Sequence, residues 1–480
     1  MKQKFISNLF LLIFLNLLVK PFWIFGIDRT VQNVVGASEY GLYFSLMNFS
    51  MLLNILLDLG LTNFNNRNIS QNAHLLSKHL SNLVSLKFLL GVIYILISFI
   101  IAGVLGYDSR QFFILFFLII NQFLISFTQY LRSNLAGLQY FKTDSFISVL
   151  DRTIMIVFCS LLLWGNFTHT GFKIEWFIFT QTAAYFSTAF ITFFIVLTKT
   201  SHFHFQFDLR FFLAILKRSY PYALLILLMA FYNRIDSVML ERILPDGKFQ
   251  AGIYAQGYRV LDAAAMFAFL FASLLLPMFS RMIKFKENVG QLVKFSFILL
   301  IIPAFLLAAA CFFFRANIMD LLYNNHTAES SVIFGVLMVG FVAISTTYIF
   351  GTLLTANGSL RSLNLMASIG MILNIVLNFI FIPKYGALGA AIVSLTTQFI
   401  TAGIQVWLAF RIFHFRFQTI LAFKLLAYVV FVIVLGYSLS LFQSHWLSRF
   451  IIFIIVGMGL AGASKIIPLR EMASVLFKQR

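Results

Sequence analysis

The stretch FLLGVIYILISFIIAGVL, Phe88–Leu105, runs for eighteen residues without a charged side chain. A helix of that length is close to the roughly 20 apolar residues that cross the hydrocarbon core of a bilayer. Similar runs recur along the chain, in which 61% of the residues are hydrophobic and only 11% are charged. This composition excludes a soluble globular protein. We expect an all-α polytopic membrane protein, because a β-barrel would show short alternating segments instead.

The apolar runs predict about fourteen membrane-spanning helices, separated by short joints that carry most of the basic residues. Each run has roughly the length of one bilayer crossing. The predicted spans lie near residues 5–27, 40–62, 83–105, 111–131, 145–165, 174–197, 220–241, 251–277, 291–313, 330–353, 362–383, 387–410, 418–441 and 447–467.

The Lys and Arg residues test this count, because short cytoplasmic loops carry an excess of positive charge. With the N-terminus inside, 24 of the 35 basic residues fall on the cytoplasmic side, 8 outside and 3 within helices. We therefore expect a multi-pass membrane protein with both termini in the cytoplasm. The net charge of +19 is spread over many loops. That spread favours membrane lipids over nucleic acid as partners.

Small-residue motifs that recur six spans apart indicate two matched halves. The segment Gly36–Tyr43, GASEYGLY, precedes the second span, and a shorter Gly252-Ile253-Tyr254 precedes the eighth. Because six is even, both halves should be related by a pseudo-twofold axis along the membrane normal, with a cleft between them. The expected organisation is an N-terminal lobe at 1–198, a cytoplasmic interfacial linker at 199–219, a C-terminal lobe at 220–411, and two accessory helices with a tail at 412–480.

Charged side chains inside the spans are the first candidates for function, since a charge at the bilayer centre costs about 2.5–3.5 kcal/mol. Lys20 in the first span either faces a cavity or extends toward an interface. Arg234 and Asp236 cannot share one helical face, and they either pair with other helices or contact substrate. Arg259 and Asp262 are one turn apart, the spacing of an internal ion pair.

Further candidates lie near span ends and on polar helical faces. Asp58 could stabilise packing or bind an ion, and Arg29 and Arg67 are either topology determinants or functional cations. Polar side chains at helical spacing should face water or each other. They include Asn16, Asn54, Gln181 with Tyr185 and Thr188, Asn364 and Gln398.

Enzyme signatures are poor. The sequence holds no Gly-rich phosphate loop, no HExxH and no carboxylates paired at catalytic spacing. We expect no catalytic residue, no metal site and no cofactor, and Cys159 and Cys311 fall inside predicted spans as free thiols. Transport is the predicted activity. A membrane scaffold that transports nothing is the alternative from another class.

Four motifs in this order carry a family resemblance. They are GASEYGLY at Gly36–Tyr43, Asp58-Leu59-Gly60-Leu61, Arg234-Ile235-Asp236 followed by Gly252-Ile253-Tyr254, and Tyr385-Gly386-Ala387-Leu388-Gly389-Ala390-Ala391. Across about residues 5–467 the chain resembles the polysaccharide transporter (Wzx-type O-antigen flippase) branch of the multidrug/oligosaccharidyl-lipid/polysaccharide exporter superfamily.

The resemblance implies two six-helix bundles around a central cavity, usually with two further helices, and export of an undecaprenyl-pyrophosphate-linked oligosaccharide. A polysaccharide polymerase is an implied partner. On this hypothesis Lys20, Arg234 and Arg259 are cavity cations, Arg29 and Arg67 guard the two mouths, and Asp58, Asp236 or Asp262 couples export to a proton or sodium gradient. A lipid II flippase and a cation-coupled multidrug exporter of the same superfamily are the alternatives.

Overall fold

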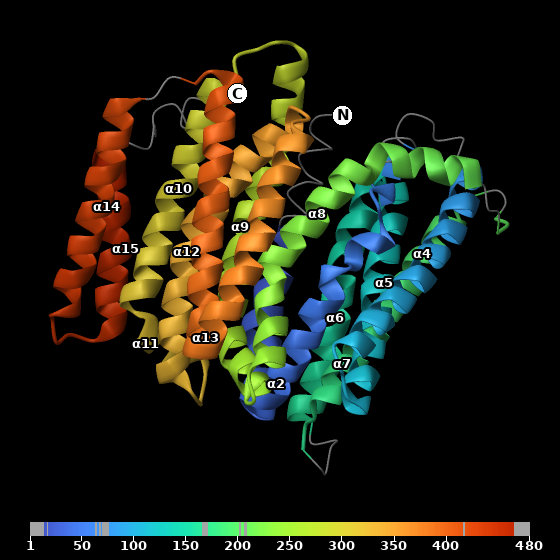
Figure 1. The fold of residues 1–480 in the computed structure, drawn as a ribbon, viewed down its shortest axis with the longest axis horizontal. Helices are drawn as coiled ribbons and strands as arrows, with labels where there is room; N and C mark the ends of the chain where they lie inside the picture. Colours follow the sequence, from blue (N-terminus) through green and yellow to red (C-terminus); the bar gives the residue numbers. More distant parts are fainter. Residues whose placement is uncertain are drawn as a thin grey trace. The chain divides into compact units, whose positions relative to one another are not determined.

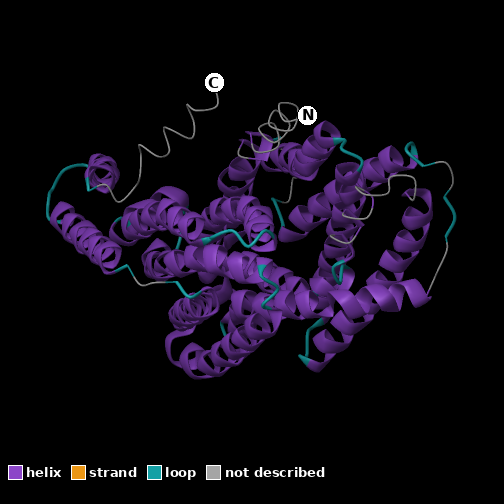
Figure 2. Cartoon of the chain, turned by 90° about the horizontal axis from the view of Figure 1, so that it is seen from above, coloured by secondary structure: helices purple, strands orange, loops and turns teal. Residues whose placement is uncertain are grey.

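The computed structural model describes residues 14–16, 18–62, 65–66, 69, 76–165, 171–200, 203–205, 209–415 and 418–464. These residues form helices joined by loops, with no strand among them (Figure 2). Eleven of the described helices are long and apolar enough to cross a membrane. These eleven helices correspond to the twelve predicted spans from the third to the fourteenth, because α13 contains two predicted spans. The expectation of an all-α polytopic membrane protein is confirmed.

The chain divides into two compact units, Met1–Gly252 and Ile253–Arg480. The helix α9 (Gly247–Lys284) begins in the first unit and continues into the second (Figure 1). The first unit also contains η1 (Trp23–Asp28), α2 (Arg29–Leu52), η2 (Asn54–Leu57), α4 (Leu76–Val104), α5 (Ser109–Gly137), α6 (Phe141–Trp164), α7 (Ile174–Leu197) and α8 (Leu209–Ile243). The second contains α10 (Gly290–Phe313), α11 (Arg315–Leu322), α12 (Thr327–Ala356), α13 (Leu360–Phe413), α14 (Thr419–Ser440) and α15 (Trp446–Ala463).

This division places α8 with the N-terminal helices, whereas the repeat pattern puts its span at the start of the C-terminal lobe. The reason is that α8 packs along α2 and reaches α5. Asn48 donates a hydrogen bond of 2.9 Å to Ser237, and Gln111 donates one of 2.7 Å to Glu241. The helix also runs without interruption from Leu209 through Pro221, so part of the expected interfacial linker belongs to α8. The organisation into two equivalent lobes stays a prediction.

Among the described residues, those of the first two predicted spans are less regular than the others. Residues Trp23–Asp28 form a π-helical turn, a feature that often accompanies functional sites. Gly36 has φ of 81°, which interrupts the helical backbone between the two spans. The helix α2 then ends at Leu52, well inside the predicted span 40–62. A short 3-10 turn that ends at Leu57 follows it, and after Asp58 the residues Leu59 and Gly60 have φ of 46° and 85°.

The 54 residues of α13 would measure about 81 Å as one straight helix, more than twice the roughly 30 Å thickness of a hydrocarbon core. Gly386, with φ of 56° and ψ of −136°, breaks the helical backbone in the middle. The two arms on either side of Gly386 correspond to the predicted spans 362–383 and 387–410.

Two glycines from the recurring motifs lie against each other within the first unit. A Cβ atom added to Gly41 would lie 1.8 Å from the carbonyl oxygen of Lys248, and one added to Gly252 would lie 1.9 Å from the carbonyl oxygen of Ala37. The backbones of α2 and the first turns of α9 therefore touch without intervening side chains. Only glycine fits at these two positions.

In the second unit, α14 and α15 pack on α10. Buried residues from the three helices form one hydrophobic cluster that includes Leu306, Val432 and Phe453. Gly436 and Gly457 lie against the side chains of Phe313 and Leu306, so small residues permit the close approach of these helices.

Candidate functional site

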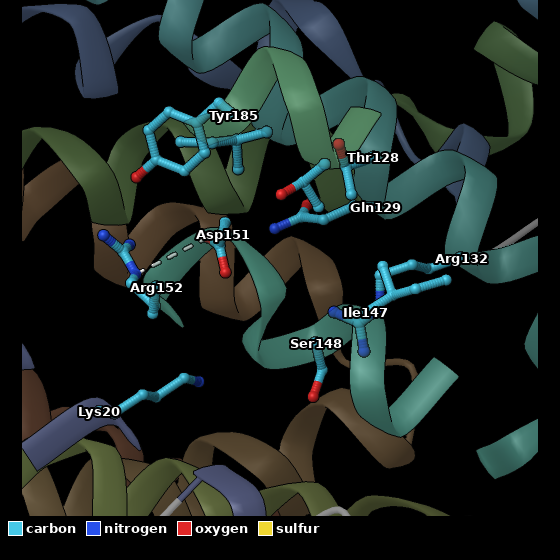
Figure 3. Close-up of a pocket in the computed structure, with 11 residues that line it drawn as sticks. Lys20, Thr128, Gln129, Arg132, Ile147, Ser148, Asp151, Arg152 and Tyr185 are labelled. Carbon is cyan, nitrogen blue, oxygen red and sulfur yellow. Dashed lines mark ion pairs between the residues drawn. The ribbon is translucent and has the colours of Figure 1, made fainter. Parts of the chain in front are cut away.

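A polar cavity of about 180 Å³ lies inside the first unit (Figure 3). Its walls come from α5, α6, α7 and the helical segment that precedes η1. The lining residues are Lys20, Ile125, Thr128, Gln129, Arg132, Ile147, Ser148, Asp151, Arg152, Tyr185 and Thr188.

Three cations line this cavity, and each is held differently. Among the described residues, Lys20 has no carboxylate within 4 Å, and its side chain extends toward the cavity (Figure 3). Arg152 Nε lies 3.7 Å from Asp151 Oδ2, and its guanidinium carbon is 5.6 Å from the centre of the Tyr185 ring. Arg132 Nε lies 2.7 Å from Asp144 Oδ1, a tighter ion pair.

The wall of the cavity carries more positive than negative charge. Lys20, Arg132 and Arg152 face a single lining carboxylate, Asp151. The hydroxyl oxygens of Thr128 and Thr188 are buried there without a hydrogen-bond partner among the described residues. Buried polar atoms normally have a partner, so these hydroxyls are suited to water or to a polar ligand. Chemically, the cavity can bind an anion through Lys and Arg donors and neutral hydroxyl groups.

Several residues singled out from the sequence meet at this cavity. Lys20 lines it, and the Asn16 amide donates a hydrogen bond of 3.0 Å to Ser148, another lining residue. Tyr185 and Thr188, which the helical spacing placed on one polar face, both line it from α7. Gln181 from the same face lies outside the lining and donates a hydrogen bond of 2.8 Å to the Tyr43 hydroxyl.

The other predicted cations of the described chain are not among the lining residues. Arg29 is the first residue of α2 and is half-buried. Arg234 on α8 has Nη1 3.4 Å from Asn48 Oδ1. In the second unit, Arg259 Nη1 lies 3.9 Å from Asp262 Oδ2, the internal ion pair that their spacing indicates. Arg67 lies outside the described residues.

The remaining candidates have separate surroundings. Asp58 Oδ1 lies 2.6 Å from Lys87 Nζ, and Asp236 is buried on α8. Asn54 is exposed in the 3-10 turn after α2. On α13, Asn364 is half-buried and Gln398 is buried.

Sequence reasoning missed part of the site because it counted Arg132 and Arg152 as cytoplasmic topology charges. Arg152 falls inside the predicted span 145–165, next to Asp151, and that position in an apolar run was the available signal. Asp28 was also missed, because the first span was ended one residue before it. Asp28 is 2% exposed on the π-helical turn, and both of its carboxylate oxygens lie 2.9 Å from the Tyr40 hydroxyl that donates to them.

Comparison with known proteins gives a family match over more than half of the chain. A family model described as polysaccharide biosynthesis protein matches residues 6–283. A capsular polysaccharide biosynthesis protein, CapF of Staphylococcus aureus, is 24% identical over 182 residues, which are 37% of this chain and 45% of that protein. The matched part spans less than half the length of the curated relatives.

Solved structures share the fold across most of the chain. The lipid II flippase MurJ in its inward closed conformation has a TM-score of 0.69 at 15% identity, and the match covers 97% of this chain and 99% of that one. An inward-facing multidrug resistance transporter of the MATE family has a TM-score of 0.62 at 14% identity, covering 83% and 94%. At such low identity, these likenesses establish the fold alone.

Proposed function

Because the chain belongs to the family of polysaccharide biosynthesis proteins, we propose that it is a flippase for undecaprenyl-pyrophosphate-linked oligosaccharides, such as the repeat unit of an O-antigen, capsule or exopolysaccharide. The lipid-linked unit passes from the cytoplasmic to the external leaflet of the bacterial inner membrane by alternating access. It then becomes available to a polysaccharide polymerase. The observation that carries this proposal is the cationic cavity around Lys20 and Arg152.

The chemistry of the cargo explains why such a cavity is needed. A pyrophosphate and a hydroxylated glycan cannot cross hydrocarbon unaided, whereas the polyprenyl tail can stay in the lipid. Sites for drug-sized ligands measure about 300–1,000 Å³. A cavity of about 180 Å³ therefore suits the pyrophosphate better than the whole oligosaccharide. In this proposal Lys20 and Arg152 bind phosphate oxygens, and the hydroxyls of Thr128 and Thr188 complete the contacts.

Coupling to a proton or sodium gradient belongs to the same proposal. Asp236 and Asp262 remain the candidates that the sequence supplied. Asp28 joins them, because its carboxylate is buried and accepts hydrogen bonds from the neutral Tyr40 hydroxyl.

The test is glycan export by Lys20→Gln and Arg152→Gln variants in a strain that lacks the chromosomal copy. Lys384→Gln, at an exposed lysine of the second unit, is the matched control. A hydrogen bond to a charged group contributes about 1.5–3 kcal/mol, so each cavity variant should reduce export about tenfold or more. Lipid-linked oligosaccharide should accumulate while protein abundance stays unchanged. Export equal to the control by both variants and by their combination would refute the proposed site.

A lipid II flippase is the second candidate, favoured by the fold match along nearly the whole chain. The discriminating experiment is expression in cells depleted of their own lipid II flippase. Survival of those cells would favour lipid II as cargo, and restored surface polysaccharide alone would favour the oligosaccharide. A multidrug exporter of cations is disfavoured by the positive wall of the cavity, and unchanged drug susceptibility on overexpression is the expected result.

A further inference from the structure

The break in the second span leaves polar backbone atoms inside the membrane part of the first unit. After α2 ends at Leu52, the amide of Leu61 bonds to the Asp58 carbonyl rather than to that of Leu57. The Leu57 carbonyl therefore lacks its helical partner. In hydrocarbon, irregular backbone is tolerated only where protein groups satisfy it.

Lys87 on α4 supplies a partner for this carbonyl, and the Ser126 hydroxyl donates a second, longer hydrogen bond to it at 3.3 Å. The Lys87 ammonium donates to the Leu57 carbonyl at 2.9 Å, to Asp58 Oδ1 at 2.6 Å and to the Ser126 hydroxyl of α5 at 3.0 Å. The Lys87 side chain is 1% exposed and lies within the apolar span Leu80–Val104. All three donors of the ammonium are thus used, and its charge faces a carboxylate.

These three oxygens resemble the surroundings of a bound alkali cation. The Leu57 carbonyl, the Asp58 carboxylate and the Ser126 hydroxyl converge on one point, from two segments that are distant in the sequence. Hard monovalent and divalent cations prefer such oxygen ligands. Asp58 is itself fixed, because it accepts hydrogen bonds from the backbone amide of Thr62 at 3.2 Å and from the Thr62 hydroxyl.

We propose that Leu57, Asp58 and Ser126 form a monovalent-cation site that the Lys87 ammonium fills permanently. The protein supplies its own tethered cation to hold the break between α2 and the helical residues that follow Gly60. Asp58 is then a positioning residue for the break rather than a free coupling carboxylate. This inference is independent of the transported cargo.

The experiment removes the ammonium and offers an inorganic ion instead. Lys87→Ala keeps all three oxygens and leaves space for a small cation. The melting temperature of the purified protein is compared in sodium, potassium and N-methyl-D-glucamine chloride at equal ionic strength. We expect sodium or potassium to raise the melting temperature of Lys87→Ala by about 3 °C or more above its effect on the wild type, in a saturable manner.

Two variants serve as controls. Lys87→Arg retains a cation and should respond to the ions as the wild type does. The double variant Asp58→Asn with Lys87→Met removes both charges, so no unpaired charge remains, and it should fold without a specific ion response. If Lys87→Ala can be purified only in sodium or potassium, the proposal is supported. Three results would overturn the proposal. The melting temperature of Lys87→Ala could be equal in all three salts, or the ion response could persist in the double variant. The third is that Lys87→Ala fails to fold in every salt while the double variant folds.

Discussion

Replacing Gly41 by alanine tests the contact between α2 and the start of α9. The new Cβ would lie 1.8 Å from the carbonyl oxygen of Lys248, whereas real Cβ atoms essentially never come closer than 3.0 Å to a heavy atom. The two backbones must therefore separate by about 1 Å. A flexible side chain could move aside, but here both partners are backbone.

The expected loss follows from that separation. Overpacking a well-packed contact typically costs about 1–3 kcal/mol. The hydrogen bond from Asn48 to Ser237 joins α2 to α8, and weakening it adds about 0.5–1.5 kcal/mol. We expect Gly41→Ala to lower the free energy of unfolding by about 3 kcal/mol.

The matched control is Gly103→Ala on α4, where an added Cβ meets nothing within 4 Å. Alanine is favoured over glycine in a helix by about 0.5–1 kcal/mol, so this variant should be neutral or more stable. Gly252→Ala should resemble Gly41→Ala, and the double variant should cost less than their sum because both disturb one contact. Denaturant unfolding in detergent measures all four proteins. Equal stability of Gly41→Ala and Gly103→Ala would refute the reasoning.

Two further predictions concern other parts of the chain. Arg110 Nη2 lies 2.5 Å from Glu39 and 2.7 Å from Glu175, and hydrogen bonds from Arg110 lower the pKa of the Glu39 carboxyl below its usual value. A carboxyl whose pKa is lowered by folding stabilises the protein above its unfolded pKa of about 4.3 and loses that contribution as the pH falls through the folded value. Arg110→Gln should therefore lower the free energy of unfolding at pH 7 by at most about 1 kcal/mol, since the ion pair is partly exposed. The difference from the wild type should shrink as the pH falls. Melting curves that keep a constant difference down to pH 3 would contradict this. Gly436→Ala would place a Cβ 2.3 Å from the Phe313 ring, but this side chain can turn aside. Denaturant unfolding should therefore show a loss of stability near the lower end of about 1–3 kcal/mol. A loss as large as that of Gly41→Ala would contradict this expectation.

Hydropathy predicted the helices well, because an apolar run of bilayer length satisfies its own backbone hydrogen bonds in lipid only as a helix. It could not predict the break after Leu52, since Leu53, Ile55 and Leu57 are as apolar as the rest of the span. Within the break, the Leu57 carbonyl accepts a hydrogen bond from Lys87, thirty residues away in the sequence.

The sequence predicted only some of the residues that line the cavity. Periodicity placed Tyr185 and Thr188 on one face, and the cost of burying charge singled out Lys20. Arg132 was read as an orienting charge, because a basic residue just beyond a span end satisfies the positive-inside rule whether it points to water or into the protein. Sequence position alone does not separate these two orientations.

The packing of α8 on α2 decides how this polypeptide can be cut for expression in pieces. A cut within 199–219 would leave Ser237 and Glu241 in one fragment and their partners Asn48 and Gln111 in the other. A cut at 252 would instead sever the first turns of α9 from the rest of a continuous helix. The two fragments should therefore need to be co-expressed in the same membrane before mild detergent can extract them as folded protein.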